Sequence, residues 1–387
     1  LYVIGAGILQ APTIEEAHKM GLGVILTSSD FQVHGDLEYK ISTKDISGNL
    51  QCANSFKDRI VGVYTQGHDV EYTVATVANW LSLPGISILS AYNCNNKVNM
   101  RSLFKVHDIP QPEFIVVHSY DEAKKKIKTY PIVVKSIDNS ASRGITIVQK
   151  AEDLEVACQK ALEFSQDKRI LLEEFIGGQE YSVDTIIYQD KLYPCGISDR
   201  KFLVKDNFAI QCGSLTPSLL PDYKQVLIYE LMNKARKALG VTMGAFKGDI
   251  IIDPNGKIYL LEVTARLSGG FDSQYRKPYC FGVNLVKATI DLAIGNELDF
   301  QDIIPKFVKY SKTFSIFPKP GIVKEIKGLE ELRAIPGIRQ VFLNTQIGKE
   351  VKDPKHCADR VVYIVVVADT YDQLNWLQCQ ATQALQI

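Results

Sequence analysis

The chain has 387 residues, of which 46% are hydrophobic and 23% are charged, an ordinary composition for a folded globular protein. Its 44 Lys and Arg residues equal its 44 Asp and Glu residues in number, so the formal net charge is zero. This balance gives no general attraction to nucleic acid or to an acidic membrane, but it does not exclude a local basic pocket for phosphate.

The cysteine pattern and the hydropathy indicate the cellular compartment in which we expect the protein. Eight cysteines are scattered along it, with no Cys-x-x-Cys pair and no grouping with His, which argues against a zinc site and against a secreted disulfide framework. No apolar run approaches the roughly 18 residues that span a bilayer, and no signal peptide is recognisable. We therefore expect a cytoplasmic protein with no membrane or nucleic-acid partner, which could form a homodimer.

The first part of the chain, residues 1–94, is predicted to be a small α/β unit. Apolar runs that suit buried strands alternate with helical spacing of apolar residues, at residues 1–4, 12–20, 24–27, 59–64 and 70–81. A β-α-β order of this kind favours a parallel sheet.

The central part, residues 95–304, is richer in strands. Strand-like runs occur at residues 115–117, 132–135, 145–148, 170–173, 181–188, 246–253 and 258–263. Helical patterns occur at residues 97–107, 122–128, 152–165, 222–239 and 284–294. Residues 199–221 are expected to be irregular. The tetrad Asp253-Pro254-Asn255-Gly256 lies between the last two strands and is typical of a tight hairpin turn.

The last part, residues 305–387, is predicted to be a compact α+β unit. Pro305 and the cluster Pro318-Lys319-Pro320-Gly321 mark its beginning. Strands are expected at residues 322–326, 341–343 and 360–367, and helices at residues 329–334 and 371–385.

A lysine at the end of a strand suggests a first binding segment. The strand over residues 130–135 ends at Lys135, and a loop of small residues over 136–144, with Ser140 and Gly144, follows it. Such a loop can fold over phosphates and offer backbone N–H groups, while Lys135 would meet phosphate oxygens as a point charge. The alternative is a lysine at a strand edge followed by an ordinary surface loop.

A second segment, residues 170–184, suits a nucleoside. An adenine ring could lie against Phe175 and Ile176, with hydrogen bonds to the backbone from Glu174 onward. Glu180 could accept hydrogen bonds from ribose hydroxyls. The alternative is a hairpin with solvated acids.

The third segment is the predicted hairpin, which carries two acids inside apolar runs. Pairing about the turn would place Asp249 opposite or nearly opposite Glu262. Buried carboxylates are costly unless they are paired or bind a metal, and oxygen ligands suit Mg²⁺. Arg266 follows and could neutralise a phosphoryl group in transfer. The alternative is an acid at a bulge, paired with Arg266 or Lys247.

Two further stretches could contact a substrate. Ser268, Gly269 and Gly270 follow Arg266 and could offer backbone donors. Arg200 lies in the expected irregular stretch between the second and third segments, where it could meet a substrate carboxylate.

The order of these segments resembles the ATP-grasp superfamily. It runs from Lys97 through IVVK and its loop to EEFIGGQEYSVD and then GDIIID…GKIYLLEVTARLSGG. Residues 305–387 resemble the C-terminal domain of the L-amino-acid ligase branch, and the chain is also similar to carbamoyl-phosphate synthase and biotin carboxylase enzymes. The resemblance implies an ATP-grasp fold, α/β and α+β, with a parallel-sheet domain over 1–94 and an ATP-grasp domain over 95–304. It also implies a lid over 130–188 and a small α+β domain over 305–387.

The resemblance also implies roles for single residues in binding ATP. Lys97 and Lys135 would contact its phosphates. Residues 173–176, beginning at Glu173, would form the adenine hinge, and Glu180 would bind the ribose. The loop of the family is usually richer in Gly than residues 136–144 are.

In the same way, the resemblance implies that Asp249 and Glu262 hold Mg²⁺ and that Arg266 stabilises an acyl phosphate. Two positions depart from the family pattern. Thr264 stands where Asn is usual, which puts its metal role in doubt, and Asp249 stands where many members have Glu.

The activity implied is an ATP-dependent ligase that phosphorylates a small carboxylate and joins it to an amine, with ADP and phosphate as products. Activation of bicarbonate and a protein that binds ATP without turnover are the alternatives. A further, weaker alternative is dinucleotide binding at Gly5-Ala6-Gly7-Ile8-Leu9-Gln10 with Asp30 as the ribose-binding acid, although Gln10 replaces the third glycine of that pattern.

Overall fold

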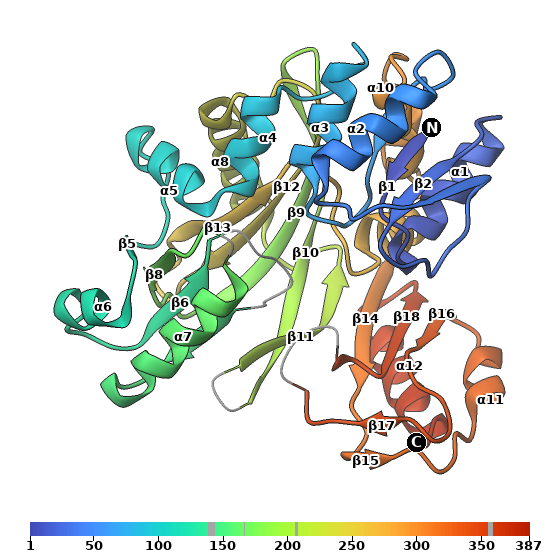
Figure 1. Ribbon diagram of the computed structural model, residues 1–387. Helices are drawn as coiled ribbons and strands as arrows, with labels where there is room; N and C mark the ends of the chain where they lie inside the picture. Colours follow the sequence, from blue (N-terminus) through green and yellow to red (C-terminus); the bar gives the residue numbers. More distant parts are fainter. Residues whose placement is uncertain (138–143, 166, 206–207, 355–358) are drawn as a thin grey trace.

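The structure is a computed structural model that describes residues 1–137, 144–165, 167–205, 208–354 and 359–387. Three large sheets, a small two-stranded sheet and the helices that cover them make up the described part of the chain (Figure 1). The combination of a parallel α/β unit with antiparallel α+β units, which the sequence predicted, is confirmed. Among the described residues, no helix combines the length and the apolar character needed to cross a membrane.

The N-terminal sheet is parallel, as expected, with the strand order β3-β2-β1-β4. Its strands are β1 (Tyr2–Ile4), β2 (Ile25–Ser28), β3 (Leu37–Lys40) and β4 (Val63–Tyr64). Side chains alternate between its two faces. Val3 packs with α1 (Ala11–Lys19) and α10 (Leu285–Ala293), whereas Tyr2 and Ile4 pack in the core that includes α2 (Ile46–Ser55) and α3 (Glu71–Trp80). Helix α10 therefore joins the chain beyond residue 264 to the N-terminal sheet.

A four-stranded antiparallel sheet has the order β5-β8-β6-β7. Its strands are β5 (Phe114–Val117), β6 (Ile132–Ser136), β7 (Ile145–Val148) and β8 (Ile170–Glu174). Apolar side chains of one face pack against α6 (Tyr120–Lys126) and α7 (Leu154–Phe164), so that face is covered. The alternate residues, Val133 and Lys135 among them, face a cavity on the other side.

The largest sheet has eight strands in the order β13-β12-β9-β10-β11-β14-β18-β16, and all of its pairs are antiparallel. Its central strands are β9 (Gln179–Tyr188), β10 (Lys191–Lys205), β11 (Phe208–Thr216), β12 (Gly244–Ile252) and β13 (Ile258–Thr264). Its C-terminal strands are β14 (Tyr310–Ile316), β16 (Ile338–Leu343) and β18 (Val362–Ala368). Because β11 pairs with β14, the sheet runs without a break from the central to the C-terminal part of the chain.

Helices bury the apolar face of this sheet at both of its ends. Side chains of α5 (Lys97–Val106) and α8 (Asp222–Leu239) share one core with β9 and β12, and α12 (Tyr371–Ala384) shares another with β14 and β18. The remaining elements are α4 (Ile88–Asn95), α9 (Lys277–Phe281), α11 (Leu329–Ala334), and the short strands β15 (Gly321–Ile322) and β17 (Glu350–Val351).

Two sequence expectations were wrong. Residues 199–221, expected to be irregular, contain most of the β10–β11 hairpin. Polar side chains such as Arg200, Gln211 and Ser214 line a cavity, so the hairpin lacks the apolar alternation by which strands are recognised. The strand expected over 322–326 is a two-residue ladder that begins at Gly321.

The junction between β11 and β14 offers a test of this sheet. A Cβ atom on Gly213 would lie 2.5 Å from the backbone oxygen of Thr313 on the neighbouring strand. We expect Gly213→Ala to force the strands apart and to lower the free energy of unfolding by about 2 kcal/mol, measured by urea denaturation. Gly23→Ala is the matched control, because the nearest atom to its new Cβ, on Asp36, is 3.7 Å away. Equal stability of the two variants would contradict the close approach.

Candidate active site

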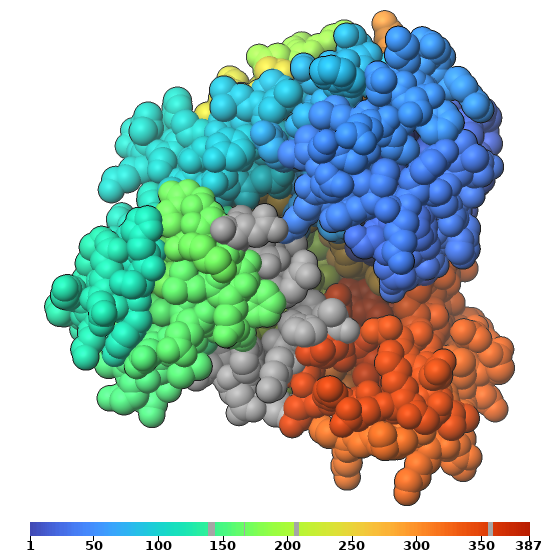
Figure 2. Space-filling view, in the orientation of Figure 1, coloured from blue at the N-terminus to red at the C-terminus, as the bar shows by residue number. Residues whose placement is uncertain are grey.

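A cavity of about 390 Å³ lies where the three sheets meet. Its lining comes from the N-terminal unit, the four-stranded sheet and the eight-stranded sheet. Figure 2 shows a hollow between the N-terminal part of the chain, in blue, and the C-terminal part, in red. Most of the predicted site residues lie along this cavity: Lys97, Lys135, Glu173, Glu174, Phe175, Ile176, Glu180, Arg200, Asp249, Glu262, Arg266, Ser268, Gly269 and Gly270.

The two acids of the predicted hairpin face each other. Strands β12 and β13 pair so that Asp249 lies opposite Glu262, with a register shift directly after Asp249. The turn fixes this register, because the Asp253 side chain accepts the N–H groups of Asn255 and Lys257, at 2.9 and 2.8 Å. The pairing predicted from the sequence is therefore confirmed.

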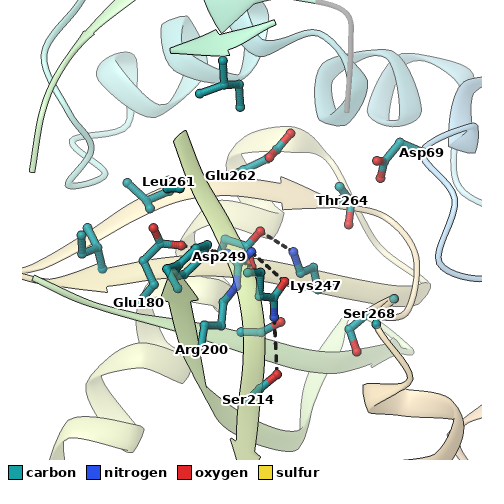
Figure 3. A pocket seen from close by; sticks show the side chains of 18 of the residues that line it. Asp69, Glu180, Arg200, Ser214, Lys247, Asp249, Leu261, Glu262, Thr264 and Ser268 are labelled. Atoms are coloured by element: carbon teal, nitrogen blue, oxygen red, sulfur yellow. Dashed lines mark hydrogen bonds and ion pairs between the residues drawn. The ribbon is translucent and has the colours of Figure 1, made fainter. Parts of the chain in front are cut away.

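Both acids have cationic partners. Lys247 Nζ donates to Asp249 Oδ2, and Arg200 Nη1 lies 3.2 Å from Asp249 Oδ1 (Figure 3). Lys97 Nζ lies 2.9 Å from Glu262 Oε1. Burial alone would raise the pKa of Asp249, but the charges of Arg200 and Lys247 outweigh burial and hold that pKa below its usual value. Asp249 is therefore ionised and ready to bind a cation.

The donor set fits Mg²⁺. Asp249 Oδ1 and Thr264 Oγ1 are buried oxygens that accept or donate no hydrogen bond within the described part of the chain. Two carboxylates and a hydroxyl are hard oxygen ligands, and Mg²⁺ commonly binds one or two carboxylates together with nucleotide phosphates. The described residues contain no group of three or more His, Cys, Asp and Glu that could hold a metal unaided. The protein thus offers part of a coordination shell, and phosphates could complete it.

Glu173 is committed to the protein itself. Its carboxylate receives Arg101 Nε and Lys135 Nζ, each at 2.6 Å, and only 2% of the side chain is exposed. Burial would raise the pKa of Glu173, but Arg101 and Lys135 lower it to about 2. Glu173 therefore holds Lys135 in place at the cavity wall, and the following residues, Glu174 and Phe175, line the cavity beside it.

Arg200 lines the cavity and contacts two of the predicted site acids. Its Nη1 is 2.9 Å from Glu180 Oε2 and 3.2 Å from Asp249 Oδ1, and its guanidinium lies over the Phe202 ring at 4.9 Å. Burial raises the pKa of Glu180, although the charge of Arg200 opposes this rise. Figure 3 places Arg200 beside Glu180 and Asp249 and away from Ser268, so it accompanies the predicted ribose and metal ligands.

One backbone donor of the loop after Arg266 is already hydrogen-bonded within the protein. The Ser268 N–H donates to Asp184 Oδ1 at 2.9 Å, so this backbone donor, which the sequence suggested for a substrate, is already used. Gly269 and Gly270 line the cavity, and Gly270 has a φ of +63°. Gly144 does not line the cavity. Its carbonyl oxygen accepts a hydrogen bond from the Ser136 N–H at 3.2 Å. Ser140, the remaining predicted contact, lies outside the described residues.

The sequence analysis missed the partners of Arg266. Arg266 Nε donates to Asp69 Oδ1 at 2.8 Å, Arg266 Nη2 contacts the same oxygen, and Glu71 Oε1 is 3.7 Å from Arg266 Nε. Both acids follow β4, at the carboxyl edge of the parallel sheet, where α/β folds commonly place functional groups. Their position after a buried strand was the available signal.

The turn after β1 leaves no room for the dinucleotide that was considered as an alternative ligand. The Gln10 side chain is buried, and its Nε2 donates to the Gln66 carbonyl at 2.7 Å. It lies 3.1 Å from where a Cβ on Gly5 would be, so it fills the space that a third glycine would leave. Asp30, the proposed ribose ligand, is exposed.

Comparison with known proteins identifies the class. Residues 94–270 match the family model described as ATP-grasp domain, and residues 313–387 match L-amino acid ligase C-terminal domain 2. A D-alanine--D-alanine ligase from Thermoanaerobacter sp. (strain X514) is 30% identical over 207 residues, which cover 49% of this chain and 57% of that ligase. The chain thus spans little more than half the length of this relative. The chain belongs to the ATP-grasp superfamily, whose members bind ATP.

Solved structures show how far the fold agrees. The crystal structure of the L-amino acid ligase from Bacillus licheniformis superposes with a TM-score of 0.87 at 22% identity, over 99% of this chain and 97% of that one. The biotin carboxylase domain of Hydrogenobacter thermophilus 2-oxoglutarate carboxylase, in complex with MgADP and bicarbonate, gives 0.77 at 18% identity, over 100% and 90%. The full-length fold is thus similar to that of the Bacillus licheniformis L-amino acid ligase.

Asp69 should stabilise the molecule through Arg266. Only 10% of the Arg266 side chain is exposed, so loss of its main partner would leave a poorly solvated charge. We expect Asp69→Asn to lower the free energy of unfolding by about 2 kcal/mol in urea denaturation, less than a fully buried pair because Asp69 is 24% exposed. Asp30→Asn, at an exposed acid of the same unit, is the control and should change little. Equal free energies of unfolding for the two variants would contradict the stabilising role of Asp69.

Glu71 should make stability depend on pH. Burial raises its pKa from 4.5 to about 7, and the adjacent Asp69 charge adds to the rise. The folded protein therefore keeps a proton that the unfolded chain releases, so this stabilisation is full below pH 4.5 and is lost as pH rises through about 7. Relative to Glu71→Gln, the natural protein should lose about 2–3 kcal/mol of unfolding free energy between pH 5 and pH 8. Urea denaturation at both pH values measures this, and a constant difference would refute it.

Proposed function

We propose that the chain is an ATP-dependent ligase that phosphorylates a small carboxylate and joins it to an amine, with release of ADP and phosphate. The single observation that carries this proposal is the Asp249–Glu262 pair, which lies in a cation-rich cavity with Arg266 on its edge. The family matches support it, since residues 94–270 match the ATP-grasp domain and residues 313–387 match an L-amino acid ligase domain.

ATP would lie along the wall formed by the four-stranded sheet and β9. Glu174, Phe175 and Ile176 line that part of the cavity and would contact the adenine, and Glu180 would accept from the ribose. Lys97 and Lys135, which now contact Glu262 and Glu173, would turn to the phosphates. An ammonium group on a flexible stem suits such an exchange of partners.

Asp249 and Glu262 would hold Mg²⁺, with the Thr264 hydroxyl as a further oxygen. The ion would neutralise charge on the phosphate oxygens when bound. Lys247 and Arg200, which pair with Asp249, would limit the build-up of negative charge there.

The chemistry needs two displacements. A carboxylate oxygen of the acid attacks the γ-phosphorus, and ADP leaves with the electron pair of the broken bond, which gives an acyl phosphate. The amine then attacks the acyl carbon, loses a proton, and phosphate leaves with the C–O electrons. Arg266 would stabilise the charge that develops on the acyl phosphate. The acyl phosphate must be kept from water, and we propose residues 130–188 as the lid that covers it.

ADP formation with a panel of acids and amines tests this function. We expect turnover only when a suitable acid is present with Mg-ATP, and we expect Glu262→Gln to lower kcat at least about 100-fold, because a neutral amide binds Mg²⁺ poorly. Glu155→Gln, at an exposed acid of α7, is the matched control and should keep full activity. A Glu262→Gln variant that turns over as fast as the control would overturn the metal site.

A further inference from the structure

A second cavity, of about 90 Å³, lies beside the segment that carries Arg266. Thr264, Arg266 and Ser268 line the main cavity, whereas Ala265 and Leu267 line the second one. Among the described residues, Arg266 alone is part of both linings. The two cavities therefore flank this segment, and the second cavity has walls of its own.

The walls of the second cavity are mainly apolar. They come from β4, α3, α10 and the first residues of β12, and they include Val63, Val74, Ala75, Ala245 and Leu292. The cavity thus lies between the N-terminal unit and the eight-stranded sheet. An apolar cavity of about 150 Å³ takes up benzene, so one of about 90 Å³ has room for an apolar body of about four carbon atoms.

One buried oxygen in these walls has no hydrogen bond. Glu71, on α3, is 2% exposed and lines the second cavity but not the main one. Its Oε2 accepts from Asn95 Nδ2 at 2.6 Å, whereas its Oε1 has no hydrogen-bond partner in the described part of the chain. Arg266 Nε lies 3.7 Å from Oε1 and donates instead to Asp69. A buried carboxyl oxygen is costly without a hydrogen bond, so a ligand that supplies one would stabilise it.

The other polar side chains of the walls are engaged within the protein. The Tyr64 hydroxyl shares a hydrogen bond with Thr289 Oγ1 at 2.7 Å. Thr65 Oγ1 donates to the Ile4 carbonyl at 2.8 Å. Within the described lining, Glu71 Oε1 is therefore the one buried side-chain oxygen left to anchor a ligand.

The charges around this oxygen favour a neutral ligand. Arg266 would repel an ammonium group placed at Glu71, and the ionised forms of Asp69 and Glu71 would repel a carboxylate. Burial raises the pKa of Glu71 to about 7, so its ionised and protonated forms both occur near neutral pH. A hydroxyl group donates to the first form and accepts from the second, so it suits both.

We propose that the second cavity binds a small neutral alcohol, with its hydroxyl on Glu71 Oε1 and a body of about four carbon atoms against the apolar walls. This site is separate from the cavity proposed for ATP and the carboxylate. The inference goes beyond the proposed function and does not depend on it, because it rests on the second cavity and on the buried oxygen in its wall.

Nuclear magnetic resonance of the natural protein with labelled Val and Leu methyl groups tests this site. At pH 8, where Glu71 is ionised, the probe 1-butanol can donate to Oε1, but its isomer methyl propyl ether cannot. We expect 1-butanol to shift the methyl signals of Val74 and Leu292, which line the second cavity. The signals of Val133 and Leu261, in the main cavity, should not change. The Kd of 1-butanol should be at least about tenfold lower than that of the ether.

Two variants test the cavity and its anchor separately. Ala75 is 1% exposed, and Ala75→Leu extends a side chain into the cavity, so it should raise the Kd of 1-butanol at least about tenfold. Ala151→Leu, at an exposed alanine outside both cavities, is the control and should bind as the natural protein does. Glu71→Met removes the anchor, so 1-butanol and the ether should bind to it within about twofold of each other.

Each outcome decides the matter. Shifts at Val74 and Leu292, together with a preference for the alcohol that Glu71→Met loses, establish the site. The inference is overturned if these methyl signals do not shift, if the natural protein binds alcohol and ether equally, or if Ala75→Leu binds as well as the control. If neither variant unfolds cooperatively in urea, the methyl shifts and the alcohol-to-ether ratio of the natural protein decide alone.

Discussion

Two carboxylates held opposite each other on neighbouring strands are the constraint around which this cavity is built. Like charges placed directly across an antiparallel pair repel, so Asp249 and Glu262 need compensation wherever they are buried. Lys97, Lys247 and Arg200 supply it. Under the proposed function, Mg²⁺ would take the place of Lys97 at Glu262, and the phosphates would take up the released lysine.

The sequence was sufficient wherever the determining interactions are local. The Asp253-Pro254-Asn255-Gly256 turn sets the hairpin register through side-chain contacts within four residues, so the position of Asp249 opposite Glu262 followed from counting along two strands. The β-α-β order at the start of the chain likewise predicted the parallel sheet. Strands that are buried on both faces of a sheet are continuous apolar runs, which can be recognised in the sequence.

The sequence was insufficient where partners come from distant parts of the chain. Arg266 and Asp69 are 197 positions apart, and Arg101 and Glu173 are 72 apart, so no spacing rule links them. Glu173 was assigned to the adenine hinge because its neighbours suit that role, but its carboxylate is held by Arg101, which is distant in the sequence, and by Lys135. The β10–β11 hairpin was missed for a related reason: a strand that lines a polar cavity carries polar residues on the face where a core strand is apolar.

The C-terminal part of the chain contacts the loop that follows Arg266 in the site. Strand β14 extends the eight-stranded sheet, and the Tyr363 hydroxyl on β18 donates to the Gly270 carbonyl at 3.0 Å and lies 2.9 Å from Thr313 Oγ1, with which it shares a hydrogen bond. Phe342 on β16 stacks on Phe271 in the same loop. The backbone after Arg266 is thus fixed from the C-terminal side, whereas Arg266 itself is fixed from the N-terminal side by Asp69. The loop after Arg266 can hold a precise geometry because it is fixed at both ends. The N-terminal sheet holds one end through Asp69, and the C-terminal strands of the eight-stranded sheet hold the other.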